Sequence, residues 1–287
     1  MWFLYALLSA AFSGFSIIIN KKALQKLNPT VVTWGLFVIP IPFLLLGVLN
    51  SPRPELTQLF FIGVFSSSVV FFLAKTLSLK SMRDNLLSRL IPLGAFSTLF
   101  NYLIGLFLLD EHLKITAVVG IIAIIIGVYI FNLEEKNRFL DPFILLYKNR
   151  YARIFLIAMF LTSLSTLFDK IAITNMNPTN PYLPYLIEDI IMGGVMTIYL
   201  SIRNKDWTKQ VKMNLPLLLL AGIVYMGVGI TVFLGFANGP LVLITGVKKL
   251  EIVIVLLLSY LLFKDKPNFN SLLGTFIMIL GVVLIKI

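Results

Sequence analysis

The sequence predicts an all-α, polytopic membrane protein with ten transmembrane helices, arranged as two inverted five-helix repeats. Composition is the first reason. Of the 287 residues, 59% are hydrophobic and 13% are charged, and the mean hydropathy is +0.96, far above that of a water-soluble protein. The second reason is that apolar runs of about 20 residues, each long enough to cross about 30 Å of hydrocarbon, recur along the whole chain. The third is that the two halves match each other in sequence at two places.

The ten predicted spans follow one another with short connections. Their approximate ranges are 2–25, 30–49, 58–79, 85–109, 115–132, 152–175, 182–202, 214–236, 240–263 and 269–287. The first run has no basic start and continues too far for a secretory signal, so we interpret it as a span. These ranges leave no room for a soluble domain.

The first and sixth predicted spans share a pattern. The stretch "SGFSIIINKKALQKLNP" (13–29) aligns with "TSLSTLFDKIAITNMNP" (162–178) at a constant offset of 149. The matched pairs are Ser16 with Ser165, Asn20 with Asp169, Lys21 with Lys170, and Asn28-Pro29 with Asn177-Pro178.

The ends of the two halves match as well. The stretch "DEHLKITAVVGIIAIIIGV" (110–128) aligns with "KDKPNFNSLLGTFIMILGV" (264–282). The matched pairs are Glu111 with Asp265, Gly120 with Gly274, and Gly127 with Gly281. We expect these glycines to be packing faces, because small residues let helix backbones approach closely in lipid.

The matches divide the chain into a first repeat (1–132), a charged linker (133–151) and a second repeat (152–287). Because each repeat has an odd number of spans, the second enters the membrane from the opposite side. The result is the inverted-repeat plan of many transporters.

Loop charge predicts an orientation. Of the 24 Lys and Arg residues, sixteen lie on the side reached after the first span, three lie on the side of the termini, and five lie inside spans. The positive-inside rule therefore predicts that both termini are outside. The net charge of +11 is mostly loop charge of this kind and does not indicate a nucleic-acid partner.

Several function classes are disfavoured. The chain has no cysteine and one histidine, His112, so neither a thiolate site nor a histidine metal centre is expected, and we expect no cofactor. It has no Gly-x-Ser-x-Gly, His-Glu-x-x-His or Walker pattern, so neither an intramembrane enzyme nor an ATP-driven pump is expected. A scaffold without transport activity is a minor alternative.

Nine charged residues fall inside the predicted spans. They are Lys75, Arg89, Asp169, Lys170, Glu188, Asp189, Lys248, Lys249 and Glu251. A charge at the bilayer centre costs about 2.5 to 3.5 kcal/mol on insertion scales, so we expect most to line a wet interior or to pair with one another. Lys75 and Arg89 are near span ends, where their stems can reach the headgroups. Lys170 is either a site residue or part of an internal ion pair.

Lys248 and Lys249 are the strongest signal, because they lie deep in the ninth span. Glu251 follows Lys248 by three residues and is expected to pair with it along one helix face, which leaves Lys249 as free charge. Thr245 is on the face of Lys248 and can add a hydroxyl. The alternative is that these charges form an ion-paired brace between helices.

The two five-span halves, closed by "GLFLLDEHLKITAVVGIIAIIIGV" and "YLLFKDKPNFNSLLGTFIMILGV", resemble the drug/metabolite transporter superfamily, specifically its EamA-type ten-helix members. The resemblance covers essentially the whole chain. It implies termini in the cytoplasm, opposite to the loop-charge prediction, and both orientations stay open.

Two stretches resemble the triose-phosphate and nucleotide-sugar translocator branch of that superfamily. "INKKALQKLNP" resembles an element that would place Asn20 and Lys21 along the cavity, and "GVKKLEIVIVLLLSYLLF" resembles a paired-basic motif that grips a substrate phosphate. The matching positions of that motif are Lys248 and Lys249. The second basic residue is usually Arg in that branch, whereas Lys binds phosphate as a point charge rather than as a fork.

Two functions follow. The first is a secondary transporter that carries an anionic, organic-phosphate-like metabolite by alternating access, with exchange expected. Its substrate-binding residues would be Lys248, Lys249, Lys170, Lys21, Asn20, Arg89 and Thr245.

The second function is a proton-coupled exporter of amino acids or other neutral or zwitterionic metabolites, with the lysines paired. The coupling or ion-pair residues are Glu251, Glu188, Asp189 and Asp169. For either function the expected partners are a small-molecule substrate and the lipid bilayer, with a homodimer as a possible assembly. The expected location is the cell membrane, either the plasma or the inner membrane.

Overall fold

The computed structural model of the protein describes residues 1–81, 91–133, 140–204, 206–264 and 266–287. Its first-half elements are α1 (Trp2–Leu24), α2 (Pro29–Val38), α3 (Pro40–Leu49), β1 (Glu55–Leu56), α4 (Gln58–Ser81), the 3₁₀ helix η1 (Ile91–Ala95), α6 (Phe96–Leu108) and α7 (Ile115–Phe131). The remaining elements are α8 (Asp141–Lys148), α9 (Arg150–Thr174), β2 (Met176–Asn177), α10 (Tyr182–Arg203), α11 (Trp207–Met213), α12 (Leu215–Asn238), α13 (Leu241–Lys248), α14 (Glu251–Phe263) and α15 (Phe269–Lys286).

Asparagine caps begin several of these helices. Asn28 Oδ1 accepts a hydrogen bond from the Thr30 backbone N–H at 3.0 Å, and Pro29 occupies the first helical position of α2. Asn268 caps α15 in the same way, through the Ser271 N–H at 2.7 Å. These caps satisfy backbone donors that have no partner within the helix.

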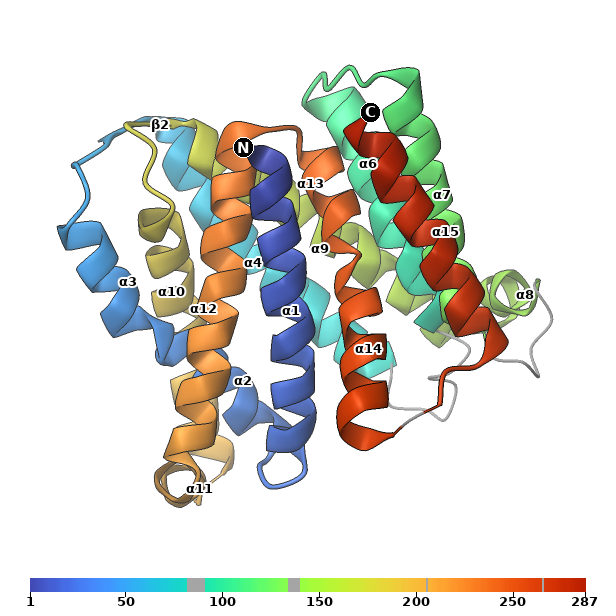
Figure 1. Cartoon of the computed structure of the whole chain (residues 1–287). Coiled ribbons are helices and arrows are strands. Elements are labelled where there is room, and N and C mark those ends of the chain that lie inside the picture. Colours follow the sequence, from blue (N-terminus) through green and yellow to red (C-terminus); the bar gives the residue numbers. More distant parts are fainter. Residues whose placement is uncertain (82–90, 134–139, 205, 265) are drawn as a thin grey trace.

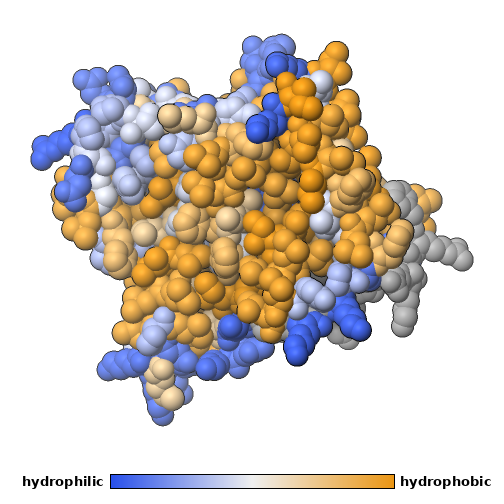
Figure 2. Space-filling model, in the orientation of Figure 1, coloured by the Kyte–Doolittle hydropathy of each residue, from blue (hydrophilic) through white to orange (hydrophobic). Residues whose placement is uncertain are grey.

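The described residues contain seven helices that are long and apolar enough to cross a membrane: α1, the α2–α3 pair, α4, α9, α10, α12 and α15. The apolar helices at Leu93–Leu108 and Ile115–Phe131 are shorter, and α13 and α14 form an interrupted pair. Apolar residues cover the middle of the face seen in Figure 2, and polar residues gather at its two ends. The protein is therefore a helical, multi-pass integral membrane protein, and the count of ten spans stays a prediction.

The two halves contact each other in reciprocal pairs. Helix α1 packs along α12, and α4 packs along α9, so the first long helix of each half meets the third of the other. Helices α2 and α3 contact α10, α6 contacts α13, and α7 packs along α15. Both termini lie at the same end of the molecule, at the top of Figure 1. Reciprocal helix contacts of this kind are expected of two repeats related by a twofold axis. They support the prediction that the two repeats have inverted topology, which stays a prediction.

Close packing of α7 against α15 confirms the predicted role of the paired glycines. A Cβ atom on Gly120 would lie 2.5 Å from the Gly281 carbonyl oxygen, and one on Gly281 would lie 2.6 Å from the Gly120 oxygen. Gly127 and Gly274 approach each other in the same reciprocal way. Any larger side chain at these positions would push the two helices apart.

The ninth predicted span is not one continuous helix. Helix α13 ends at Lys248 and α14 begins at Glu251. Between them the Lys249 N–H donates to the Gly246 carbonyl at 3.0 Å, and the Leu250 N–H donates to the Val247 carbonyl at 3.0 Å. These three-residue spacings are those of a 3₁₀ turn, so the helix tightens and changes course where the lysines lie.

Candidate functional site

A cavity of about 270 Å³ lies between the two halves of the chain. Its wall is formed by α2, α4 and α6 from the first half and by α9, α10, α12, α13 and α14 from the second. Its polar and charged lining residues are Ser67, Ser68, Ser97, Asn101, Thr162, Ser163, Ser165, Thr166, Asp169, Glu188, Asp189, Thr245, Lys248, Lys249 and Glu251. Its aromatic lining residues are Phe37, Phe71, Tyr185, Tyr225, Phe233 and Phe236. A solute in this cavity would meet both charged groups and aromatic rings.

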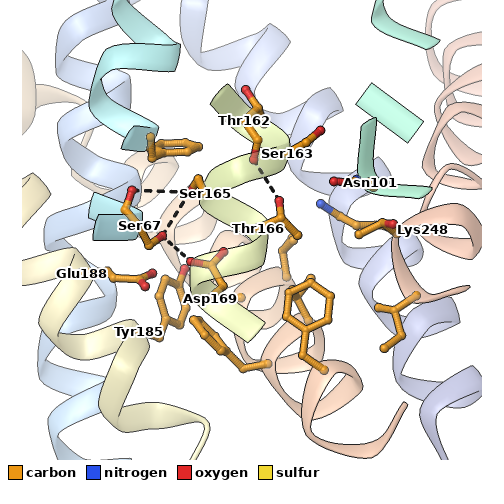
Figure 3. A pocket seen from close by; sticks show the side chains of 18 of the residues that line it. Ser67, Asn101, Thr162, Ser163, Ser165, Thr166, Asp169, Tyr185, Glu188 and Lys248 are labelled. Carbon is orange, nitrogen blue, oxygen red and sulfur yellow. Dashed lines mark hydrogen bonds between the residues drawn. The ribbon is translucent and has the colours of Figure 1, made fainter. Parts of the chain in front are cut away.

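The basic side of the cavity carries the two lysines at the break between α13 and α14. Lys249 Nζ donates a hydrogen bond to Ser97 Oγ at 3.1 Å, which joins the break to the start of α6. The Lys248 ammonium has no hydrogen-bond or ion-pair partner among the residues that the structure describes, and it extends toward Asn101 (Figure 3). Lys248 therefore presents a positive charge that these residues do not neutralise.

The acidic side carries three carboxyl groups, Asp169 from α9 and Glu188 and Asp189 from α10. Asp169 accepts a hydrogen bond from the Ser67 hydroxyl, which also bonds the Ser165 hydroxyl at 3.0 Å. Glu188 lies on the same side of the cavity as Asp169 and Ser67 (Figure 3). Glu188 Oε1 and Asp189 Oδ2 are buried and have no partner within the described ranges. This side is therefore rich in acceptors and poor in donors.

No ion pair bridges the two sides among the described residues, so Lys248 acts on Asp169 only through space. Figure 3 shows Asp169 and Glu188 gathered with Ser67 on one side of the view, and Lys248 with Asn101 on the other. Within the part of the chain that is described, no ion pair joins a lysine of the cavity to a carboxylate. The cavity thus has a basic end, with the lysines, and an acidic end, with Asp169 and Glu188.

Glu251 does not pair with Lys248 as the spacing predicted. It accepts a hydrogen bond from the hydroxyl of Ser13 on α1. The prediction assumed one unbroken helix, in which residues three apart lie on the same face. The turn at Lys249 and Leu250 breaks the helix, so Lys248 and Glu251 do not share a helix face. The expected roles of the lysines are also exchanged, because Lys249 has a partner and Lys248 has none in the described chain.

Lys170 does not line the cavity. Its ammonium donates hydrogen bonds to the backbone carbonyls of Phe236 and Gly239, the latter at 2.7 Å, at the end of α12. Glu111 completes this contact, because its carboxylate accepts from the Leu241 N–H at 2.6 Å and from the Val242 N–H at 3.1 Å.

We call these contacts the α12–α13 brace. The cation meets the negative end of one helix dipole and the anion meets the positive end of the next, so both contacts are electrostatically favourable. The turn that they hold lies at the end of the molecule that carries the termini (Figure 1).

The other predicted site residues divide as follows. Thr245 lines the cavity, with its hydroxyl bonded to the Leu241 carbonyl at 2.9 Å. Asn20 and Lys21, near the end of α1, are not among the lining residues, and Lys75 is exposed on α4. Arg89 lies outside the described residues.

Sequence reasoning identified Thr245 but missed the other uncharged polar residues of the site. Ser67, Ser97 and Asn101 come from first-half helices that carry no charge beside the cavity in the described chain. The available signal was the density of hydroxyls in otherwise apolar spans, as in "SSS" (66–68) and "TSLST" (162–166). The aromatic residues gave no signal, because a Phe that lines a cavity and a Phe that faces lipid look alike in a sequence.

Comparison with known proteins identifies the family of the fold. A family model described as the EamA-like transporter family matches residues 1–133 and 151–287. Among solved structures 28 chains match, and one crystal structure superposes with a TM-score of 0.72 at 11% identity, covering 99% of this chain and 95% of that chain. At that identity the likeness concerns the fold alone. A search of curated proteins found no match.

Proposed function

The chain belongs to the EamA-like transporter family and is a multi-pass membrane transporter of small metabolites, and on that premise we propose that it carries a small zwitterionic solute, such as an amino acid, by alternating access. The observation that carries this proposal is the separation of charge in the cavity, with Lys248 at one end and the Asp169 and Glu188 carboxyls at the other.

A zwitterion matches this arrangement in both of its charges. Its carboxylate offsets the charge of Lys248, and its ammonium group donates to the acceptor-rich acidic side. Charged groups away from water are tolerated only when they are paired and hydrogen-bonded, so a solute with both charges stabilises the occupied cavity at both ends.

The size and lining of the cavity favour an amino acid with an apolar side chain. A volume of about 270 Å³ is small beside the range of roughly 300 to 1,000 Å³ typical of small-molecule sites. A nucleotide sugar is therefore disfavoured. The aromatic rings of Phe233, Tyr225 and Phe71 offer apolar surface for a side chain between the charged ends.

A second candidate is the anionic, organic-phosphate-like substrate, with exchange of one anion for another. Lys248 favours it, because its ammonium has no partner among the described residues, where the one hydrogen-bond partner of the Lys249 ammonium is the neutral Ser97. Against it stands the acidic side, since an anion would leave Asp169, Glu188 and Asp189 without a counter-charge.

Alternating access is supported by two features of the elements. Substrate sites of many inverted-repeat transporters lie where a membrane helix is interrupted, and the break between α13 and α14 borders this cavity. The α12–α13 brace joins Glu111 of the first half to the second half beside the Lys170 contact. Release of such a contact is a natural step when the halves rock against each other.

The test is uptake by proteoliposomes of three matched solutes. Phenylalanine has both charges, 3-phenylpropionate lacks the ammonium group, and phenethylamine lacks the carboxylate. We expect saturable, protein-dependent uptake of phenylalanine only, and loss of uptake in Lys248→Gln and in Glu188→Gln. The control variant is Lys75→Gln, whose side chain is exposed and outside the cavity lining.

The competing outcomes are distinct. Transport of 3-phenylpropionate or of glycerol 3-phosphate in preference to phenylalanine would contradict the zwitterion and favour the anion. Equal uptake of phenylalanine by wild-type protein and Lys248→Gln would contradict the proposal that Lys248 binds the carboxylate of the solute.

A further inference from the structure

We propose that a basic surface at the end of the molecule opposite the termini binds the headgroups of anionic phospholipids. The surface is formed by residues 22–28, at the end of α1 and in the turn after it, and by residues 203–204 and 206–214, at the end of α10 and along α11. We call it the α1/α11 corner. None of its residues lines the cavity, so the inference is independent of the solute that the protein carries.

The corner carries an excess of positive charge. Its exposed cations are Lys22, Lys26, Arg203, Lys209 and Lys212. The one acid in the same ranges is Asp206. None of the five cationic side chains forms a hydrogen bond or an ion pair with the described residues. Their charge is therefore available to an anion outside the protein.

Packed elements carry these cations. Leu27, after α1, lies in one buried cluster with Leu218 of α12, and Val211 of α11 packs against that cluster. The rings of Trp34 on α2 and Trp207 on α11 meet edge to face, with their centroids 5.2 Å apart. This packing fixes α11 against α2 and α12, so the cations belong to a surface that exists before a ligand arrives.

A hydrogen bond joins the two basic segments directly. The Asn28 backbone N–H donates to Gln210 Oε1 at 3.1 Å. Asn28 follows Lys26 by two residues, and Gln210 lies between Lys209 and Lys212 in the sequence. The lysines of α1 and those of α11 are therefore carried by neighbouring stretches of chain, and one layer of headgroups meets both.

Exposed apolar side chains adjoin the cations. Ile202, next to Arg203, and Met213, next to Lys212, are each 72% exposed. Helix α11 lies at the lower end of Figure 1, and Figure 2 shows polar residues at that end directly beneath the apolar band. A phospholipid carries an anionic group beside apolar chains, so it matches both kinds of side chain. A phosphate ion from water would match only the cations.

The end that carries the termini has no comparable surface among the described residues. Its loop cations are Arg53, Lys114 and Lys286. The Lys114 ammonium donates to the Ile287 carbonyl at 3.5 Å, and the Lys286 ammonium lies 5.4 Å from the centre of the Phe3 ring. Two of the three charges thus have partners within the protein, so we expect the preference for anionic lipid at the α1/α11 corner alone.

The tryptophans allow the corner to be observed without a label. The chain has three, of which Trp34 and Trp207 stack beside the corner, whereas Trp2 lies at the opposite end. The full-length Trp2→Phe protein therefore reports lipid contact at the corner when lipids with brominated chains quench its fluorescence. It is reconstituted in vesicles of phosphatidylcholine and phosphatidylglycerol in equal parts, with one or the other lipid brominated.

We expect brominated phosphatidylglycerol to quench more strongly than brominated phosphatidylcholine. The relative binding constant should favour phosphatidylglycerol by about fivefold or more, the contribution of one cation at an anionic surface. The preference should weaken as sodium chloride is added, because salt screens surface charges. Neither measurement needs a change in the corner itself.

A pair of charge-matched variants locates the preference. Changing Lys22, Lys26, Lys209 and Lys212 to Gln should abolish it. The control changes four exposed cations of other turns on the same predicted side to Gln, namely Lys148, Arg150, Lys264 and Lys266, and should keep the preference.

Three results would overturn the proposal. The first is equal quenching by the two brominated lipids in the Trp2→Phe protein. The second is an equal loss of preference in the corner variant and its control, which would show a general effect of charge. The third is loss of the preference in inorganic phosphate at an ionic strength where chloride has no effect, which would show a site for small anions in place of lipid.

Discussion

Lys248 and Lys249 are neighbours in the sequence, yet their ammonium groups have different surroundings. Lys249 bonds Ser97 and helps to join the two halves, whereas Lys248 has no partner in the described chain and extends toward Asn101. The sequence singled out both residues because a charge inside an apolar span is costly. It assigned their partners wrongly because that assignment depended on an unbroken helix.

This difference predicts different effects of removing each charge. Lys248→Met should weaken phenylalanine binding by about 10- to 100-fold, the range of one hydrogen bond to a charged group, and leave the melting temperature nearly unchanged. Lys249→Met should lower the melting temperature, because it removes the bond to Ser97. Calorimetry and thermal unfolding measure the two effects, with Lys75→Met as the matched control. Equal losses of stability in both variants would contradict the assignment.

The α12–α13 brace belongs to the scale of elements. Lys170 was predicted as a site residue because it is a cation inside a span, and Glu111 drew notice only through its match with Asp265. The sequence alone does not show that Lys170 and Glu111 hold the α12–α13 turn, because each contact depends on where a helix from another part of the chain ends or begins. The packing glycines of α7 and α15 were predictable, because their spacing is repeated in both halves.

The brace predicts a change in access to the cavity. Lys170→Met should open the end of the molecule that carries the termini, because two charge-assisted hydrogen bonds at the α12–α13 turn are lost. The chain has no cysteine, so a single Val232→Cys reporter in the cavity lining can be labelled without background. We expect an impermeant maleimide applied from that side to react about tenfold or more faster in the Lys170→Met background.

The control for this experiment is Lys114→Met. Lys114 is a cation at the same end of the molecule, and its ammonium bonds the Ile287 carbonyl rather than the α12–α13 turn. Equal labelling rates in all three backgrounds would show that the brace does not limit access.

At the scale of the whole molecule, the cavity forms where the two halves pack together. The sequence gives the order of the halves but not how they pack. The repeats, the helical membrane fold and all six charged lining residues were predictable from composition, sequence matches and charge inside apolar runs. The separation of the charges was not, because it depends on how α9 and α10 face the α13–α14 break across the interface. It is this separation that leads us to propose a zwitterion rather than an anion as the substrate.

The central claim is that the two ends of the cavity bind the two charges of one solute, and a ligand-truncation cycle tests it most directly. The ratio of the Kd of 3-phenylpropionate to that of phenylalanine measures the contribution of the ammonium group. In wild-type protein this ratio should be about 10 or more, since a hydrogen bond to a charged group is worth about 1.5 to 3 kcal/mol. In Glu188→Gln it should fall close to one, and in Lys248→Gln it should persist although both ligands bind more weakly. A ratio that is unchanged in Glu188→Gln and lost in Lys248→Gln would contradict the claim.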